Sequence, residues 1–328
     1  MELRTIVEIP KYDFKINYTD KCFFIGSCFS ENIGDKLLKS KIPTLINPTG
    51  THYNPFSIAH SIENIINCKK FSEKKLFFSN GQWNCYDFHS KFSGNSAKEV
   101  LNNINSAISI SNKFLQQADY LFVAFGTSLV YCLKDNFEIV SNCHKQKSAL
   151  FEHFMLSDET ISQKWVKILE LLEDFNPKLK IIFTVSPIRH VKNGAIENMQ
   201  SKANLIIAIK NLSEITTIKN IYYFPVYEIV NDELRDYRFY ADDMQHISKL
   251  AIDYIWEIFQ KEIFTQKTTE FVKQINSIEK ALFHKPLSHN TEEFRKFCKS
   301  QIEKIKNIEQ TYKINLTEAK EAFERSLE

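Results

Sequence analysis

The chain has 328 residues, of which 43% are hydrophobic, so it is long enough for one sizeable α/β domain and an additional segment. Its 42 basic and 40 acidic residues give a formal net charge of +2, which argues against nucleic acid or an anionic membrane as the main partner. The stretch MELRTIVEIPKYDFKINYTDK lacks the apolar core of a signal peptide, and no later stretch has about 18 uncharged apolar residues in a row. We therefore expect a cytoplasmic protein without a membrane span, and the seven scattered cysteines favour reduced thiols.

Five short apolar runs predict strands, and they alternate with stretches of helical periodicity. The strands are expected at 22–26, 43–47, 120–126, 180–186 and 221–227, and the helices at about 30–41, 97–117, 157–174, 195–213 and 247–262. The strand sequences are almost continuously apolar, as in parallel strands that are covered on both faces. We therefore predict a doubly wound parallel α/β sheet of about five strands.

Two segments depart from this alternation of strands and helices. Residues 68–95 form an expected insertion, in which Asn80-Gly81 between apolar flanks predicts a two-residue β-hairpin. From about residue 265 the chain is charged, glycine-free and helix-prone, which predicts one or two helices packed on the domain or on another copy of the chain. We thus expect an α/β domain over residues 1–264 and a helical C-terminal extension over residues 265–328.

Polar residues follow each predicted strand, where an open parallel sheet binds its ligands. The groups after the first four strands are Ser27, Cys28 and Ser30; Asn47, Gly50, His52 and Asn54; Gly126, Thr127 and Ser128; and Arg189 with His190. After the fifth strand, Asp243 lies three residues before His246, so its carboxylate can hold the ring through Nδ1–H and leave Nε2 as a base. Asp243 could instead cap the following helix.

The chain resembles the GSCFA family, within the SGNH/GDSL hydrolase superfamily. The motifs that carry the resemblance are Gly26-Ser27-Cys28-Phe29-Ser30, NPTGTHYNP (47–55), WNCYDFHS (83–90), FGTSLVY (125–131), NCHK (142–145), TVSPIRH (184–190) and DELRDYRFYADDMQH (232–246). The resemblance covers about residues 1–262. It implies a three-layer, flavodoxin-like fold of the SGNH type and leaves the reaction open.

The resemblance also implies roles for several residues. GSCFSEN laid on the GDSLTEG block of GDSL enzymes puts Cys28 at the nucleophilic serine and Ser27 at the aspartate. The N–H groups of Cys28 and Gly50 would then form an oxyanion hole, with Ser128 where the enzymes have an asparagine. A helix N-terminus and an adjacent His246 are expected to lower the pKa of the thiol. Ser27 remains the alternative nucleophile or a helix N-cap, and Cys28 could be a buried, inert residue.

The remaining polar residues at this edge are expected to line a substrate pocket. They are Asn47, His52, Asn54, Thr127, Asn142, His144, Arg189 and His190. The histidines, with Asp87 and His89, have no HExxH or paired Cys/His spacing, so we expect no metal and no cofactor. Arg189, Arg235 and Arg238 could bind an anionic substrate group or pair with nearby aspartates.

The sequence therefore predicts an SGNH-like hydrolase or acyltransferase that acts on an ester-type substrate through an acyl-enzyme on Cys28, with His246 as base and Asp243 orienting it. The expected partners are a small-molecule, glycan or acyl substrate and a second copy of the chain docked through the C-terminal helices. The alternative is a catalytically degenerate module that binds an acyl or glycan-like ligand, motivated by the missing asparagine. A third interpretation is a scaffold whose tail helices bind a partner.

Overall fold

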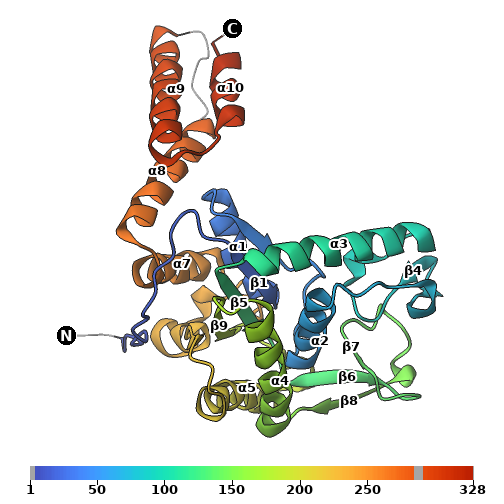
Figure 1. Ribbon diagram of the computed structural model, residues 1–328. Helices are drawn as coiled ribbons and strands as arrows, with labels where there is room; N and C mark the ends of the chain where they lie inside the picture. The colour runs from blue at the N-terminus through green and yellow to red at the C-terminus, as the bar shows by residue number, and fades with distance from the viewer. Residues whose placement is uncertain (1–3, 284–290, 328) are drawn as a thin grey trace.

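The computed structural model describes residues 4–283 and 291–327, and its centre is a five-stranded parallel sheet (Figure 1). The strands are β1 (Cys22–Gly26), β2 (Thr44–Ile46), β5 (Tyr120–Phe125), β9 (Lys180–Val185) and β10 (Ile221–Tyr223). They lie in the order β10-β9-β5-β1-β2, and every neighbouring pair is parallel. The predicted sheet is confirmed, and its order is flavodoxin-like, with the switch point between β1 and β5.

Side chains of the central strands alternate between two apolar clusters, because successive strand residues point to opposite faces. On one face, Phe24 and Phe122 stack with ring centroids 4.3 Å apart, among side chains of α1 (Cys28–Lys39) and α7 (Lys249–Ile263). On the other face, Phe125 packs on Trp165. The helices on that face are α2 (Pro55–Ile66), α3 (Ala97–Gln117), α4 (Asp158–Phe175) and α5 (Ala195–Ile215). The predicted three-layer fold is therefore confirmed.

Helices α1, α3, α4, α5 and α7 match the five predicted helices to within a few residues. Helix α2 is absent from the sequence prediction, although its start carries two recognised signals. The side chain of Asn54 accepts a hydrogen bond from the Ser57 N–H at 2.8 Å, and Pro55 occupies the first helical position. The prediction treated this region as a loop because its polar residues were assigned to the site.

The strand predicted at 221–227 ends at Tyr223 in the structure. Pro225 has no N–H to give to a sheet, and the chain turns there into the short helix α6 (Val226–Glu228) and a π-helical segment, Ile229–Leu234. The prediction was therefore wrong for the second half of this strand.

Two small antiparallel sheets flank the central one. The predicted hairpin is confirmed as β3 (Phe77–Ser79) and β4 (Gln82–Asn84), with positive φ angles of 51° at Asn80 and 78° at Gly81. A second sheet of β6 (Leu129–Leu133), β7 (Ile139–Val140) and β8 (Phe151–Met155) was not predicted. Its strands are short and β8 exposes three of its five residues, although the apolar run LVYCL of β6 was an available signal.

The C-terminal region contains three helices in the described residues, where one or two were predicted. They are α8 (Gln266–Leu282), α9 (Glu292–Tyr312) and α10 (Thr317–Arg325), and α9 and α10 lie side by side in Figure 1. Phe271 of α8 belongs to the same apolar cluster as Phe259 of α7. The division into 1–264 and 265–328 stays a prediction, and residues 1–3, 284–290 and 328 of those ranges lie outside the described residues. None of the described helices is long and apolar enough to cross a membrane.

The sheet leaves no room for a side chain at Gly26, the last residue of β1. A Cβ atom there would lie 2.2 Å from the carbonyl oxygen of Ala124 on β5, and the φ angle is +131°. The next residue, Ser27, donates its N–H to the same oxygen at 3.0 Å. Only glycine therefore permits the turn that begins α1 at this distance from β5.

We predict that Gly26→Ala lowers the free energy of unfolding by on the order of 3 kcal/mol or more, because backbone strain and a clash with Ala124 add together. Gly81→Ala is the matched control: its φ is also positive, but its Cβ would have nothing within 4 Å, and the expected loss is about 1 kcal/mol. Urea unfolding followed by circular dichroism measures both variants. Equal losses would show that the close approach to β5 is not the cause.

Candidate active site

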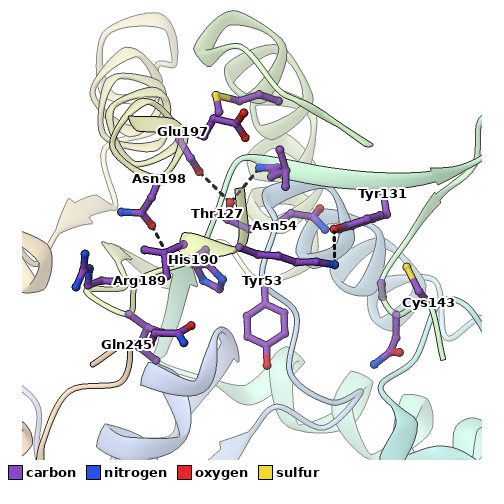
Figure 2. Close-up of a pocket in the computed structure, with 18 of the residues that line it drawn as sticks. Tyr53, Asn54, Thr127, Tyr131, Cys143, Arg189, His190, Glu197, Asn198 and Gln245 are labelled. Atoms are coloured by element: carbon purple, nitrogen blue, oxygen red, sulfur yellow. Dashed lines mark hydrogen bonds between the residues drawn. The ribbon is translucent and has the colours of Figure 1, made fainter. Parts of the chain in front are cut away.

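A cavity of about 450 Å³ opens at the carboxyl ends of the parallel strands (Figure 2). Its lining comes from the segments after β2, β5 and β9, from β6 and the segment after β7, from α5, and from the segment before α7. In Figure 2, Arg189, His190, Asn198 and Gln245 lie on one side of the cavity, and Tyr131 and Cys143 lie on the other. Parallel α/β proteins bind their ligands at this edge of the sheet.

Asp243 and His246 form a closely hydrogen-bonded pair before α7, and His246 lines the cavity. His246 Nδ1 and Asp243 Oδ2 are 2.6 Å apart. The other carboxylate oxygen accepts the N–H groups of Gln245 and His246, both at 2.9 Å. The Gln245 N–H bond, the His246 side chain and the His246 N–H together lower the pKa of Asp243 to about 2. The carboxylate is therefore ionised at neutral pH, and it orients the imidazole with Nε2 free; the cap of α7 is Ser248 instead.

Arg189 ties this pair to the segment that follows β9. Its N–H donates to the Gln245 carbonyl at 3.1 Å, and its Nη1 donates to the Met244 carbonyl at 3.3 Å. Arg189 therefore lines the cavity and also fixes the loop that carries His246. The other two arginines pair with aspartates, Arg235 with Asp232 at 3.6 Å and Arg238 with Asp236 at 3.9 Å.

Cys28 is the first residue of α1 and is half-buried. Its Sγ lies 3.5 Å from the hydroxyl of Tyr53, a residue of the cavity lining. Among the described residues, no hydrogen bond joins Cys28 to His246. Burial raises the pKa of the Cys28 thiol, the Tyr53 hydroxyl opposes that rise, and Glu31 adds to it. The expected lowering of this pKa is therefore wrong for this conformation, because the effect of burial exceeds that of the hydrogen bond to the thiol. The group that makes this hydrogen bond is Tyr53 and not His246.

Ser27 occupies the N-cap position of α1, but its side chain makes no capping hydrogen bond. It is 1% exposed, and its Oγ has no hydrogen-bond partner in the described structure. Ser30, the third residue of α1, is also 1% exposed, and its Oγ likewise has no hydrogen-bond partner in the described structure. The thiol of Cys28 is thus the more accessible of the two candidate nucleophiles.

The expected oxyanion donors differ in how far they are already engaged in the structure. The N–H of Gly50 donates to the Asn47 carbonyl at 2.9 Å, so it is not free to donate to a substrate. Ser128 is fully buried, its N–H donates to Ser201 Oγ at 2.7 Å, and its own Oγ has no partner. The N–H of Cys28 lies in the first turn of α1, where an N–H has no acceptor within the helix. The Cys28 N–H therefore stays an expected oxyanion donor, whereas the Gly50 N–H is taken up by the turn that closes on Asn47.

Five of the eight expected pocket residues line the cavity: Asn54, Thr127, Asn142, Arg189 and His190. Of these, His190 has the ring whose titration is most affected by burial. Its N–H donates to Asn198 Oδ1 at 2.8 Å, its Nε2 is buried without a partner, and burial lowers its pKa to about 3. A neutral imidazole therefore faces the cavity near the end of β5.

The other three expected pocket residues hold loops in place, so the prediction was wrong for them. Asn47 accepts the Gly26 N–H at 2.9 Å and donates to Glu31 at 3.1 Å. His52 is fully buried and bonds to Thr49 through Nε2 at 2.9 Å, and burial lowers its pKa to about 3. His144 bonds to a main-chain carbonyl, that of Cys85, at 2.8 Å.

Sequence reasoning missed a polar stripe on α5 that holds the carboxyl ends of β5 and β9. Asn198 binds the main chain of His190, Ser201 binds Thr127 and the Ser128 N–H, and Lys202 binds two carbonyl oxygens. The available signal was the spacing of three and four residues that puts Asn198, Ser201 and Lys202 on one face of the helix. The stripe fixes the positions of the third and fourth loops of the site.

Lys202 is the most unusual member of the stripe, because it is 1% exposed and has no carboxylate partner in the described residues. Its Nζ donates to the carbonyl oxygens of Gly126 at 2.5 Å and Ser186 at 2.6 Å. Burial lowers the pKa of Lys202 to about 7. The buried amine of Lys202 thus links the ends of two central strands.

No three His, Cys, Asp or Glu side chains converge as a metal site in the described ranges. The histidines weighed as ligands are separated: His52 bonds to Thr49 and His144 to Cys85, while Asp87 lies 3.5 Å from His60.

The chain belongs to the GSCFA family. A profile of that family matches residues 21–259, and a profile described as the GSCFA domain protein, C-terminal domain, matches residues 275–328. The recognition made from the motifs is therefore confirmed, and the matched range contains the turn after β1, the Asp243–His246 pair and every residue of the cavity lining. No match was found among the curated proteins.

The chain is also similar to several solved structures, at low identity and low TM-score. A carbohydrate esterase family 3 protein from Talaromyces cellulolyticus has 10% identity and a TM-score of 0.36, over 79% of this chain and 99% of its own. An acetyl xylan esterase from Butyrivibrio proteoclasticus has 11% identity and a TM-score of 0.38, over 75% and 65%. A family 3 carbohydrate esterase from Clostridium thermocellum has 12% identity and a TM-score of 0.35, over 78% and 98%. At these scores the likeness says nothing about the substrate of this chain.

We predict that Lys202 makes stability rise with pH above about pH 7. Its folded-state pKa of about 7 lies below the ordinary value of 10.5, so between these values the unfolded chain binds more protons than the folded chain. The free energy of unfolding of the wild type, minus that of Lys202→Met, should therefore increase by up to about 1.4 kcal/mol per pH unit from about pH 7 to 9. Below about pH 7 this difference should stay constant. Urea unfolding at several pH values measures it, and a difference that is flat above pH 7 would contradict a neutral buried lysine.

Proposed function

We propose that this protein is an SGNH-like hydrolase or acyltransferase that acts on an ester-type substrate through an acyl-enzyme on Cys28. The observation that carries the proposal is the Asp243–His246 pair, 2.6 Å apart, on a cavity at the ligand-binding edge of the sheet. An ionised carboxylate on Nδ1 fixes the tautomer in which Nε2 can accept a proton. The partly exposed thiol at the start of α1 supplies a nucleophile at the same edge.

The proposed reaction has two steps. In the first, the thiol proton passes to His246 Nε2, the sulfur attacks the ester carbonyl carbon, and the C–O bond breaks as His246 protonates the leaving oxygen. In the second, His246 removes a proton from water or an acceptor hydroxyl, whose oxygen attacks the thioester and releases the thiol. The N–H of Cys28 stabilises the oxyanion in both steps.

Cys28 is the favoured nucleophile over Ser27 for two reasons. Cys28 is partly exposed, whereas Ser27 is 1% exposed. The thiol also has a polar partner, the Tyr53 hydroxyl, that can stabilise its anion. The mechanism requires His246 and Cys28 to come within hydrogen-bond reach when substrate is bound, as catalytic groups that are apart in the free enzyme often do.

The second candidate function is a ligand-binding module with the same cavity and no acyl transfer. It is favoured by one observation: the N–H of Gly50, expected in the oxyanion hole, is already donated to the Asn47 carbonyl. Loss of one oxyanion donor costs roughly 2.7–4 kcal/mol of transition-state stabilisation. In this case a small acyl or glycan-like ligand would bind in the cavity and leave unchanged.

We predict that Cys28→Ala abolishes hydrolysis of short activated esters and that His246→Ala lowers kcat by about 10²–10⁴-fold, because proton transfer loses its positioned base. Asp243→Asn should also lower kcat, since the carboxylate orients the ring. Release of the phenol from a nitrophenyl ester measures the rates. Intact-mass spectrometry after rapid quenching should detect one acyl group, on the peptide that contains Cys28.

The control is Cys68→Ala, which removes another half-buried thiol outside the cavity lining. It should retain the rate of the wild type. Full activity in Cys28→Ala with an acyl group on Ser27 would transfer the role to the serine. An inert Cys28 together with no turnover of any ester, while a ligand still binds, would favour the binding module.

A further inference from the structure

Tyr53 occupies a fixed position between the cavity and Cys28. It lies in the loop between β2 and α2, and its carbonyl oxygen accepts the N–H groups of Gly126 and Thr127 at 2.8 and 2.9 Å. These two bonds attach the loop to the end of β5. The main chain of Tyr53 is therefore held by the central sheet, and its side chain starts from a rigid point.

The ring of Tyr53 is held as firmly as its main chain. It meets the ring of His190 edge to face, with centroids 5.6 Å apart and an interplanar angle of 70°. A Cβ atom on Gly126 would lie 2.9 Å from the Tyr53 carbonyl oxygen and 3.2 Å from His190 Nε2, so the contact also needs a glycine. From this position the Tyr53 hydroxyl reaches Cys28 Sγ at 3.5 Å.

The contact geometry allows either group to donate, and the titratable groups around the pair favour the phenol as the donor. Burial and the neighbouring Cys28 both raise the pKa of the Tyr53 phenol, so it keeps its proton where the thiol loses its own. The titratable groups that face Cys28 are Tyr53 and Glu31 of α1, and Glu31 disfavours the thiolate. His190, which faces Tyr53, has a pKa lowered to about 3 by burial and carries no charge at neutral pH.

We propose that Tyr53 is a positioning residue for Cys28: its hydroxyl donates a hydrogen bond to the sulfur, stabilises the thiolate and holds it beside the cavity. This role rests on the proposed function only in so far as Cys28 is the nucleophile, and the hydrogen bond itself can be tested without any substrate. No covalent bond forms or breaks at Tyr53. Its hydroxyl increases the fraction of Cys28 that is thiolate at neutral pH, whereas Glu31 and burial decrease that fraction.

The test is the pH dependence of Cys28 alkylation by iodoacetamide in the full-length wild type and in Tyr53→Phe. Modification is followed at the Cys28 peptide by mass spectrometry from about pH 6 to pH 10. Tyr53→Phe keeps the ring on His190 and the carbonyl that binds Gly126, and removes only the hydroxyl. We expect the midpoint of the profile to move to higher pH and the rate at neutral pH to fall about fivefold, with the two rates converging at high pH.

Two controls separate a lost hydrogen bond from a loosened site. Cys143 is a half-buried thiol of the cavity lining, and no hydrogen bond joins it to Tyr53 in the described structure, so its profile should not move. Tyr131→Phe removes a hydroxyl from the other side of the cavity, where it contacts Lys192 at 3.5 Å, and should leave the Cys28 profile unchanged. A loosened site would raise the Cys28 rate at every pH in place of shifting the midpoint.

An unchanged midpoint in Tyr53→Phe would overturn the proposal, even if Cys28 forms an acyl-enzyme. A shifted midpoint would support it, including in a protein that hydrolyses no ester. Failure of the proposed function and failure of the Tyr53 role are therefore distinct outcomes.

Discussion

The contact of Gly26 with β5 is the constraint on which the candidate site depends. Three hydrogen bonds converge there: the Gly26 N–H goes to the Asn47 side chain, the Gly26 carbonyl accepts the His52 N–H, and Ser27 donates to Ala124. They join the ends of β1 and β5 to the loop after β2, which contains Tyr53. The missing Cβ is what permits this distance. The position of Cys28 at the start of α1 and its contact with Tyr53 both follow from this junction.

Buried polar atoms without protein partners gather at the same edge of the sheet. They include Ser27 Oγ after β1, Ser128 Oγ after β5, and Thr184 Oγ1 and His190 Nε2 in and after β9. Each such atom costs about 1–3 kcal/mol of stability when nothing compensates. The stripe on α5, above all Lys202 with its two carbonyl acceptors, stabilises the loops that carry them. The unpartnered polar atoms at the candidate site therefore lower the stability of the fold, and the hydrogen bonds from α5 offset part of that loss.

Most of the central fold was predictable because it is written in local patterns. Continuous apolar runs located the five strands, and Asn80-Gly81 located the hairpin. The failures have equally local causes. Helix α2 was missed because Asn54 was weighed as a site residue and not as a helix start. The sheet of β6, β7 and β8 was missed because its strands are short and partly exposed. Its strands are stabilised by pairing with one another, and a local sequence pattern does not show which strands pair.

For the site, the sequence by itself determined which residue types reach the edge of the sheet and that Asp243 is near enough to His246 to hold its ring, because strand ends and a three-residue spacing are local properties. The tertiary structure decided which of those groups are free. Gly50 and Ser128 have donated their N–H groups, Asn47, His52 and His144 hold loops, and Tyr53 contacts the thiol. Whether a donor is occupied depends on how loops distant in sequence dock on one another, and periodicity and motif spacing carry no information about that docking.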